Sequence, residues 1–358
     1  MRLAKDIQIY LKTTETCNLN CSHCFTSGSN GKRIFFNPTK TAKFINNLYE
    51  SENLNSMRVL FHGGEPLLAP VKDFYSFYDQ VKDLKNIAFG IQTNLVYKLN
   101  EKKLSFFKDI LNLEGIGTSW DPNIRFGSNG ITSREQDIKL WESNIKTLVN
   151  LGSELTLMVS LSRDVIEKFE PREILDYAIS LGIKFILFER ITDDGNSQIN
   201  NEVLPSNMSL DLWLFSMYEQ TLEDDRYLKI GNMFLDEIAT SYVNGSHVAN
   251  RCRGCEQKLI TINANGTLSG CPNSAPTSLW GKIDENPSNF IKSNQRTDAI
   301  CKELTRNSIC LTCEVNDLCN GDCYKLKWDG DICSAPKTLF KYLKQSNKTA
   351  ECSKLLIK

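Results

Sequence analysis

The first half of the chain alternates short apolar runs with longer amphipathic segments. The short runs have the length and composition of buried strands, and the longer segments have the periodicity of helices. This alternation indicates βα units around a parallel sheet. Six units are too few to close a standard eight-stranded barrel, but right-handed crossovers would curl them into a partial one. The expected strands span 7–12, 57–61, 87–92, 116–120, 155–161 and 183–188, and the expected helices begin near 39 and include 71–84, 104–111, 134–151 and 172–181.

Three cysteines, Cys17, Cys21 and Cys24, follow the first expected strand. Three thiolates on one short loop can hold three irons of a 4Fe-4S cluster, which leaves the fourth iron open to a small chelating molecule. An open coordination position is the mark of a catalytic metal site. A structural zinc loop is the alternative, although zinc sites usually pair two-residue gaps and close with a fourth ligand. His23, the other nearby ligand type, is cramped between the cysteines.

The spacing Cys-x3-Cys-x2-Cys, followed by Phe25, resembles the radical S-adenosylmethionine (SAM) enzymes. The resemblance implies that the amino acid end of SAM chelates the open iron. It also implies that the reduced cluster cleaves SAM into methionine and a 5′-deoxyadenosyl radical, which abstracts hydrogen from a substrate. The difficult chemistry would then belong to the cofactor, and the protein would position the reactants and exclude water.

A second motif, Gly63-Gly64-Glu65-Pro66, ends the second expected strand. Adjacent glycines let a backbone approach a ligand closely, and Glu65 offers an acceptor for an ammonium group. Alone the motif is equally a tight turn. The resemblance implies that it holds the methionine amine of SAM, and that loops after the third and fourth strands complete the site. The SAM contacts implied are Phe25, Gly63, Gly64, Glu65, Pro66, Thr93, Asn94 and Ser119.

Ten more cysteines lie between Cys252 and Cys352, where the alternation of strands and helices stops. Their spacing resembles the SPASM extension of radical SAM enzymes, which implies two auxiliary 4Fe-4S clusters and three clusters in all. Zinc sites of four cysteines each are the alternative. Asn265-Gly266 is a type I′ hairpin signal that would bring the first ligands together. The implied ligand sets are Cys252, Cys255, Cys271 and Cys323 for one auxiliary cluster, and Cys310, Cys313, Cys319 and Cys333 for the other.

The expected organisation is a partial barrel over 1–245, a SPASM domain over 246–335 and a C-terminal helix over 336–358. Cys301 and Cys352 lie outside the ligand sets, and buried inert thiols are the default expectation for both. The C-terminal helix reads as basic and amphipathic, and packing is its expected role.

Charge and composition exclude several classes of function. Lys and Arg total 42 against 43 Asp and Glu, so neither nucleic acid nor an anionic membrane is indicated as a partner. Three histidines and no paired nucleophile give hydrolysis or acyl transfer little support. The chain has neither a signal-like start nor a long apolar stretch, so a cytoplasmic protein is expected. So many cysteines in the cytosol favour metal or redox use over disulfides.

The substrate is the least defined part of the prediction. The resemblance favours maturation of a ribosomally made peptide, with a small molecule or a non-enzymatic electron-transfer or sensor role as alternatives. Only 16 residues precede Cys17, so a leader peptide would need a separate recognition protein; flavodoxin or ferredoxin would donate electrons. With four thiolates each, the auxiliary clusters would carry electrons outward from the product radical. Sulfatase maturation is disfavoured because Pro272, rather than Asp, follows Cys271. The candidate substrate contacts are Asp121, Glu189, Arg190, Asp193 and Asp194, although a solvated loop is the favoured interpretation for the last two.

Overall fold

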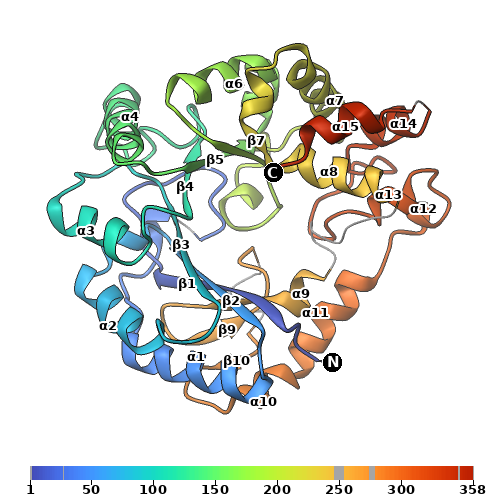
Figure 1. Cartoon of the computed structure of the whole chain (residues 1–358). Helices are drawn as coiled ribbons and strands as arrows, with labels where there is room; N and C mark the ends of the chain where they lie inside the picture. The colour runs from blue at the N-terminus through green and yellow to red at the C-terminus, as the bar shows by residue number, and fades with distance from the viewer. Residues whose placement is uncertain (1, 27, 246–253, 274–278, 346, 358) are drawn as a thin grey trace.

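The computed structural model describes residues 2–26, 28–245, 254–273, 279–345 and 347–357. The described strands form one ten-stranded sheet in the order β10-β9-β8-β1-β2-β3-β4-β5-β6-β7. Strands β1 to β6 run parallel in sequence order, and helices surround the curved sheet (Figure 1). The predicted α/β partial barrel is confirmed. The strands are β1 (Asp6–Thr14), β2 (Ser56–Gly63), β3 (Ile87–Thr93), β4 (Ile116–Trp120), β5 (Leu155–Leu161), β6 (Phe185–Arg190), β7 (Gly231–Asn232), β8 (Leu259–Ile262), β9 (Thr267–Ser269) and β10 (Gly281–Lys282).

Local capping signals explain where several helices begin. Asn37 accepts a hydrogen bond from the backbone N–H of Lys40 ahead of α1, and Ser133 forms a capping box with Gln136 ahead of α4. These side chains satisfy N–H groups that the first helical turn leaves without a partner. The α-helices are α1 (Pro38–Glu52), α2 (Val71–Val81), α3 (Glu101–Asp109), α4 (Arg134–Asn150), α5 (Arg163–Lys168), α6 (Pro171–Ser180), α7 (Asn207–Glu223), α8 (Met233–Val243), α9 (Cys255–Lys258), α10 (Pro287–Ile291), α11 (Asn294–Leu304), α12 (Ser308–Leu311), α13 (Asn316–Cys319), α14 (Lys337–Gln345) and α15 (Thr349–Leu355).

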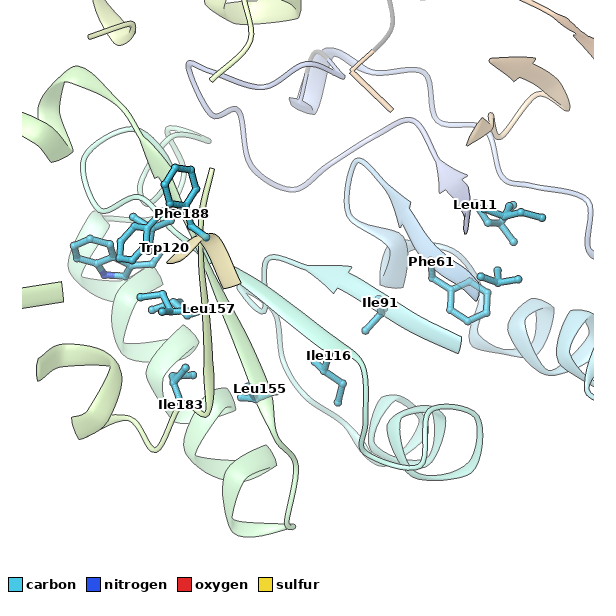
Figure 2. Close-up of a cluster of buried hydrophobic side chains, with 14 of the residues drawn as sticks. Leu11, Phe61, Ile91, Ile116, Trp120, Leu155, Leu157, Ile183 and Phe188 are labelled. Carbon is cyan, nitrogen blue, oxygen red and sulfur yellow. The ribbon is translucent and has the colours of Figure 1, made fainter. Parts of the chain in front are cut away.

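The apolar core lies between the sheet and the helices. Buried and partly exposed residues alternate along β2, β5 and β6, because successive side chains of a strand point to opposite faces. The buried set includes Phe61, Leu157 and Phe188, which Figure 2 shows among apolar side chains on neighbouring strands. The intervening residues, such as His62 and Met158, line a cavity inside the partial barrel. The same alternation therefore builds both the core and the cavity.

The cysteine-rich segment joins the barrel through its first hairpin. Strand β8 pairs parallel with β1, and β9 returns antiparallel to β8, so the sheet continues beyond the six predicted units. The hairpin is the predicted one, but its turn differs. Asn263 and Thr267 are joined by a 2.9 Å backbone hydrogen bond, and of the three residues between them Gly266 alone has a positive φ, of 82°. A type I′ turn needs two such residues, so this is a three-residue loop with glycine in the left-handed region.

The C-terminal stretch forms two helices instead of the single helix expected. Helix α14 packs against α7, and α15 packs against α8 (Figure 1). Tyr342 of α14 contacts the rings of Phe215 and Tyr218 edge-on. Cys352 is buried as expected, whereas Cys301 is exposed on α11, so the expectation of burial was wrong for Cys301. No helix in the described part of the chain is long and apolar enough to cross a membrane.

Phe61 offers a test of the packing between the sheet and its helices. Its fully buried ring packs edge-on against Phe74 and Phe106, with centroids 5.0 and 5.8 Å away. We expect Phe61→Ala to lower the free energy of unfolding by about 3–5 kcal/mol, because truncation leaves a cavity. The control is Ile131, which is 88% exposed. Ile131→Ala should change the free energy of unfolding by less than about 0.5 kcal/mol. Urea unfolding measures both, and equal losses would contradict the assignment of the core.

Candidate functional site

A cavity of about 760 Å³ opens at the carboxyl ends of the strands and extends along the inner face of the sheet. Its wall includes Tyr10 of β1, His62 of β2, Gln92 of β3, Ser119 of β4 and Glu189 of β6. Five of the predicted metal ligands line the same cavity, namely Cys17, Cys21, Cys24, Cys255 and Cys271.

The loop that carries Cys17, Cys21 and Cys24 leaves β1 directly into this cavity. Burial, together with the charges of neighbouring cysteines, raises the pKa of the Cys17 thiol to about 12 and of the Cys21 thiol to about 11. These thiols therefore stay protonated in the absence of a cation. The Cys17 sulfur also accepts hydrogen bonds from the backbone N–H of Leu19 at 3.4 Å and from Asn94 Nδ2 at 3.5 Å.

A loop after β6 supports the cysteine loop from outside, which the sequence did not indicate. The backbone N–H of Asn196 donates to the carbonyl of Cys24 at 2.8 Å, and its side-chain amide donates to the carbonyl of Cys21 at 3.0 Å. Asn200 donates similarly to the carbonyl of Ser22 at 3.1 Å. These bonds fix the backbone of the loop and leave the thiols directed elsewhere.

The glycine pair after β2 is needed because the backbone of this turn packs directly on the backbone at the start of the cysteine loop. Gly64 donates to the carbonyl of Thr14 at 3.1 Å, and Glu65 donates to the carbonyl of Thr16 at 3.0 Å. A Cβ on Gly64 would lie 2.0 Å from the Thr16 oxygen, and Gly63 has φ +135°. Only glycine fits at this contact. The turn thus holds the cysteine loop, and both glycines also line the cavity.

Glu65 lies behind the cavity wall. Its fully buried carboxylate accepts from the backbone N–H groups of Leu67 at 3.1 Å and Asn94 at 2.8 Å, and from Thr93 Oγ1 at 2.8 Å. The predicted contact with an ammonium group has no geometric support, because protein donors hold both oxygens and Glu65 is not a lining residue. Its carboxylate instead positions Asn94. Pro66 is likewise buried, and its carbonyl accepts from Thr13 Oγ1 at 3.0 Å.

Asp121 differs in the same way from its predicted role as a substrate contact. It is fully buried, accepts from Arg125 Nε and from the Ser160 backbone N–H, both at 2.8 Å, and lies 3.8 Å from His23 Nε2. Arg125 and His23 line the cavity, whereas Asp121 does not. Burial lowers the pKa of His23 to about 4, so this imidazole is neutral near pH 7. The role of Asp121 is therefore to orient the guanidinium of Arg125 beside the cysteine loop.

Glu189 and Arg190, at the end of β6, have different surroundings. The Glu189 side chain is half-buried and lines the cavity, as predicted for a substrate contact. The Arg190 guanidinium also reaches the cavity wall, but it forms a buried bidentate ion pair with Asp322 and donates to the Ser334 carbonyl at 3.1 Å. Arg190 therefore joins the barrel to the cysteine-rich segment. Asp194 begins a short helical turn and burial raises its pKa.

Buried carboxylates also arrange the later cysteines. Glu303 accepts from the backbone N–H of Cys255 at 2.6 Å. Glu256 accepts from the N–H of Cys271 at 3.2 Å and from the hydroxyl of Tyr324, which follows Cys323, at 2.6 Å. Three segments distant in the sequence are thereby held together, as the predicted ligand set requires. Cys252, the fourth member, lies outside the described residues.

The other predicted set lies on short turns of the C-terminal segment. Cys310 belongs to α12, and its carbonyl accepts from the N–H of Cys313 at 3.2 Å. Cys319 ends α13. Burial raises the pKa of Cys333, and the nearby charge of Cys310 raises it further. The charge of Cys333 likewise contributes to a raised pKa of Cys319, which is mainly due to burial.

The chemistry of the cysteine sets suits an iron–sulfur group. No three His, Cys, Asp or Glu side chains among them are close enough together to hold one metal ion. Zinc sites of four cysteines each stay the alternative for the later cysteines. Thiolates are the ligands of iron–sulfur clusters. The individual ligand assignments stay predictions.

The pH dependence of stability tests the enclosure of Glu65. Burial raises its pKa from 4.5 to about 7. Between these values the folded protein holds a proton that the unfolded chain has released, so stability falls as the pH rises from 4.5 to 7. We expect the pKa shift of Glu65 to account for roughly 3 kcal/mol of this fall in the free energy of unfolding. In Glu65→Gln the decline should flatten, as urea unfolding across this pH range will measure. An unchanged slope would contradict the enclosure.

The ion pair between Arg190 and Asp322 can be tested by a double-mutant cycle. Arg190→Met or Asp322→Asn should each lower the free energy of unfolding by about 3–5 kcal/mol, because each leaves one buried charge without its partner. The double variant should lose less than the sum of the two. The exposed pair Lys82 and Asp79 is the control, and Lys82→Met should lower the free energy of unfolding far less, because solvent screens an exposed pair. Additive losses in the double variant would contradict a direct interaction.

Comparison with known sequences gives limited information. No family model matches the chain. An uncharacterized protein of Methanocaldococcus jannaschii is 26% identical over 251 residues, which cover 66% of this chain and 83% of that protein.

Comparison with solved structures is more informative about the fold. The anaerobic sulfatase-maturating radical SAM enzyme anSMEcpe with bound AdoMet aligns with a TM-score of 0.79 at 16% identity, over 97% of this chain and 99% of that one. Its complex with AdoMet and the Cp18Cys peptide gives a TM-score of 0.77 at 16% identity and the same coverage. SuiB of Streptococcus suis, bound to its precursor peptide SuiA, gives 0.63 at 14% identity, over 91% of this chain and 76% of SuiB. The chain thus has the fold of radical SAM enzymes whose solved structures contain AdoMet or peptides.

Proposed function

We propose that the chain is a radical SAM oxidoreductase with a SPASM-type cysteine-rich region, and that it modifies a peptide. One observation carries the proposal: Cys17, Cys21 and Cys24 line the same cavity as Gly63 and Gly64, at the carboxyl ends of a partial barrel. The barrel thereby provides a three-thiolate set next to a space for a small molecule. The fold shared with anSMEcpe and SuiB supports the same interpretation.

The residues present suit a 4Fe-4S cluster and SAM. Cys17, Cys21 and Cys24 would hold the cluster, and the backbone around Gly63 and Gly64 with Asn94 and Ser119 would line the SAM site. A SAM-binding cluster of this kind supplies the electron that cleaves SAM and releases a 5′-deoxyadenosyl radical able to take hydrogen from an unactivated carbon.

The protein's own residues orient the reactants and limit the charge around them. Burial lowers the pKa of both His23 and His62 to about 4, so both imidazoles are neutral near pH 7, and Arg125 is paired with Asp121. The side chain of Glu189, on β6, forms no hydrogen bond or ion pair with another described residue. Its carboxylate is therefore available to a substrate.

A peptide substrate is supported by the structural relatives, and the open cavity is compatible with one. Ligand pockets for small molecules span about 300–1,000 Å³, and this cavity of about 760 Å³ would also have to accommodate SAM. The extended portion of a peptide can enter such a space while the remainder stays outside. The complexes of anSMEcpe with the Cp18Cys peptide and of SuiB with SuiA support this choice. Pro272 and Asn273 line the cavity after Cys271, where sulfatase-maturing enzymes carry Asp, so we propose a different peptide modification.

The remaining cysteines suit an oxidative reaction. Cys255 and Cys271 line the cavity, whereas Cys310, Cys313, Cys319 and Cys333 lie outside its lining. We propose two auxiliary clusters at these sets, ordered from the cavity outward. Reduced flavodoxin or ferredoxin in the cytoplasm would supply the electron for SAM cleavage, and a separate protein would present the leader peptide where one is needed.

Production of 5′-deoxyadenosine tests the proposal. Anaerobically reconstituted protein with SAM and dithionite should release it, and Cys17→Ala, Cys21→Ala and Cys24→Ala should each abolish release, because each removes one of the three thiolates. Cys301→Ala is the matched control, since this cysteine is exposed and outside all three sets. Liquid chromatography with mass spectrometry detects the product. Release by the three variants at the wild-type rate would refute the assignment of the site.

A deuterium label distinguishes the classes of substrate. A deuterated precursor peptide encoded beside the gene should transfer deuterium into 5′-deoxyadenosine if a peptide is the substrate. Transfer from a labelled amino acid, sugar or nucleoside, and none from the peptide, would favour the small-molecule alternative.

A further inference from the structure

Lys12 is a buried lysine near the carboxyl end of β1. The site described above gives this residue no role. Only 9% of the residue is exposed. It shares the inner face of β1 with Gln8 and Tyr10, which line the cavity, because residues two apart on a strand point the same way. Lys12 is therefore the member of this row nearest to the cysteine loop.

Its surroundings place the ammonium between two sets of thiols. Lys12 Nζ lies 5.7 Å from the centre of the Phe25 ring, and Phe25 directly follows Cys24. Burial lowers the pKa of Lys12, while the charges of Glu15, Cys24 and Cys271 raise it. Cys24 belongs to the first thiol set and Cys271 to the second, and both line the same cavity. Lys12 thus lies within electrostatic range of both.

Lys12 also differs from the other buried cations near the cavity. Arg125 is held by Asp121, and Arg190 is held by Asp322. Within the described part of the chain, Lys12 forms no hydrogen bond or ion pair with a carboxylate. Charging a buried amine without an anionic partner is costly, so a lysine at such a position indicates a missing anionic group.

We propose that Lys12 is a positioning residue whose positive charge stabilises the reduced state of two iron–sulfur clusters, one at Cys17, Cys21 and Cys24 and one at the Cys271 set. This inference rests on the proposed function. Reduction adds negative charge to a cluster, and a nearby ammonium in a poorly solvated site favours that state. One residue would in this way set the reduction potentials of two neighbouring clusters together.

Removal of the charge is the test. Reconstituted wild-type, Lys12→Gln and Lys12→Arg proteins are compared by anaerobic redox titration monitored by electron paramagnetic resonance. The Cys17→Ala/Cys21→Ala/Cys24→Ala protein identifies the signals of the auxiliary clusters. In Lys12→Gln we expect the reduction equilibrium of the two adjacent clusters to fall about tenfold, or about 59 mV for a one-electron couple. Lys12→Arg should stay close to wild type, and the cluster at Cys310, Cys313, Cys319 and Cys333 serves as an internal reference.

Lys103→Gln is the matched control. Lys103 is also a partly buried lysine over an aromatic ring, 4.1 Å from the centre of Tyr97, but the charge acting on it is that of Glu65. Its removal should leave all cluster potentials unchanged. Wild-type potentials in Lys12→Gln, or equal shifts in Lys12→Gln and Lys103→Gln, would overturn the inference.

Two further outcomes separate this inference from the proposed function. Wild-type protein that binds no iron would overturn both. Normal iron content and 5′-deoxyadenosine release in wild type, with unshifted potentials in Lys12→Gln, would overturn only the role of Lys12. If Lys12→Gln loses iron, Lys12→Met replaces it as the neutral variant. Loss of iron from both neutral variants, with Lys12→Arg intact, would assign the charge to cluster assembly and refute the proposed control of potential.

Discussion

The parallel pairing of β1 on both of its sides is the constraint on which the rest of the structure depends. One side pairs with β2, and the other pairs with β8 of the cysteine-rich segment. The loop after β1 therefore lies between the glycine turn after β2 and the segment that leads to Cys271. Shifting β1 by one residue would reverse its faces, moving Gln8, Tyr10 and Lys12 away from the cavity and the apolar Ile9 and Leu11 into it. The register of this strand thus determines the position of every group near the thiols.

Buried acids are the second organising feature, and each joins segments that are far apart in the sequence. Glu65 holds the loop after β3, Asp121 holds the backbone N–H of Ser160, Glu256 and Glu303 hold Cys271 and Cys255, and Asp322 holds Arg190. Burying a carboxylate is unfavourable unless donors surround it, so each position tolerates little displacement. The cysteines are consequently held by their backbones, independently of any metal. Such an arrangement orders the backbones of Cys255 and Cys271 through protein contacts alone.

The sequence predicted the parts of the structure that depend on local pattern. The strands around Ile116 and Leu155 begin and end where apolar runs do, and the hairpin at Gly266 follows from its turn residues. The roles of Glu65, Asp121 and Arg190 were not predictable, because burial and partners arise only after folding. Arg190 and Asp322 are 132 residues apart, and an acid beside a glycine pair has the same appearance whether it faces a ligand or a backbone. Asn196 and Lys12 escaped notice for the same reason, since neither residue type carries a distinctive spacing.

The two ends of the sheet have a consequence for the behaviour of the molecule in concentrated solution. Its outermost strands, β7 and β10, comprise two residues each, so they present few free backbone groups to another chain. Long exposed edges are templates for intermolecular strand pairing, and very short ones avoid it. The short outer strands therefore limit pairing between copies of a ten-stranded sheet that does not close on itself.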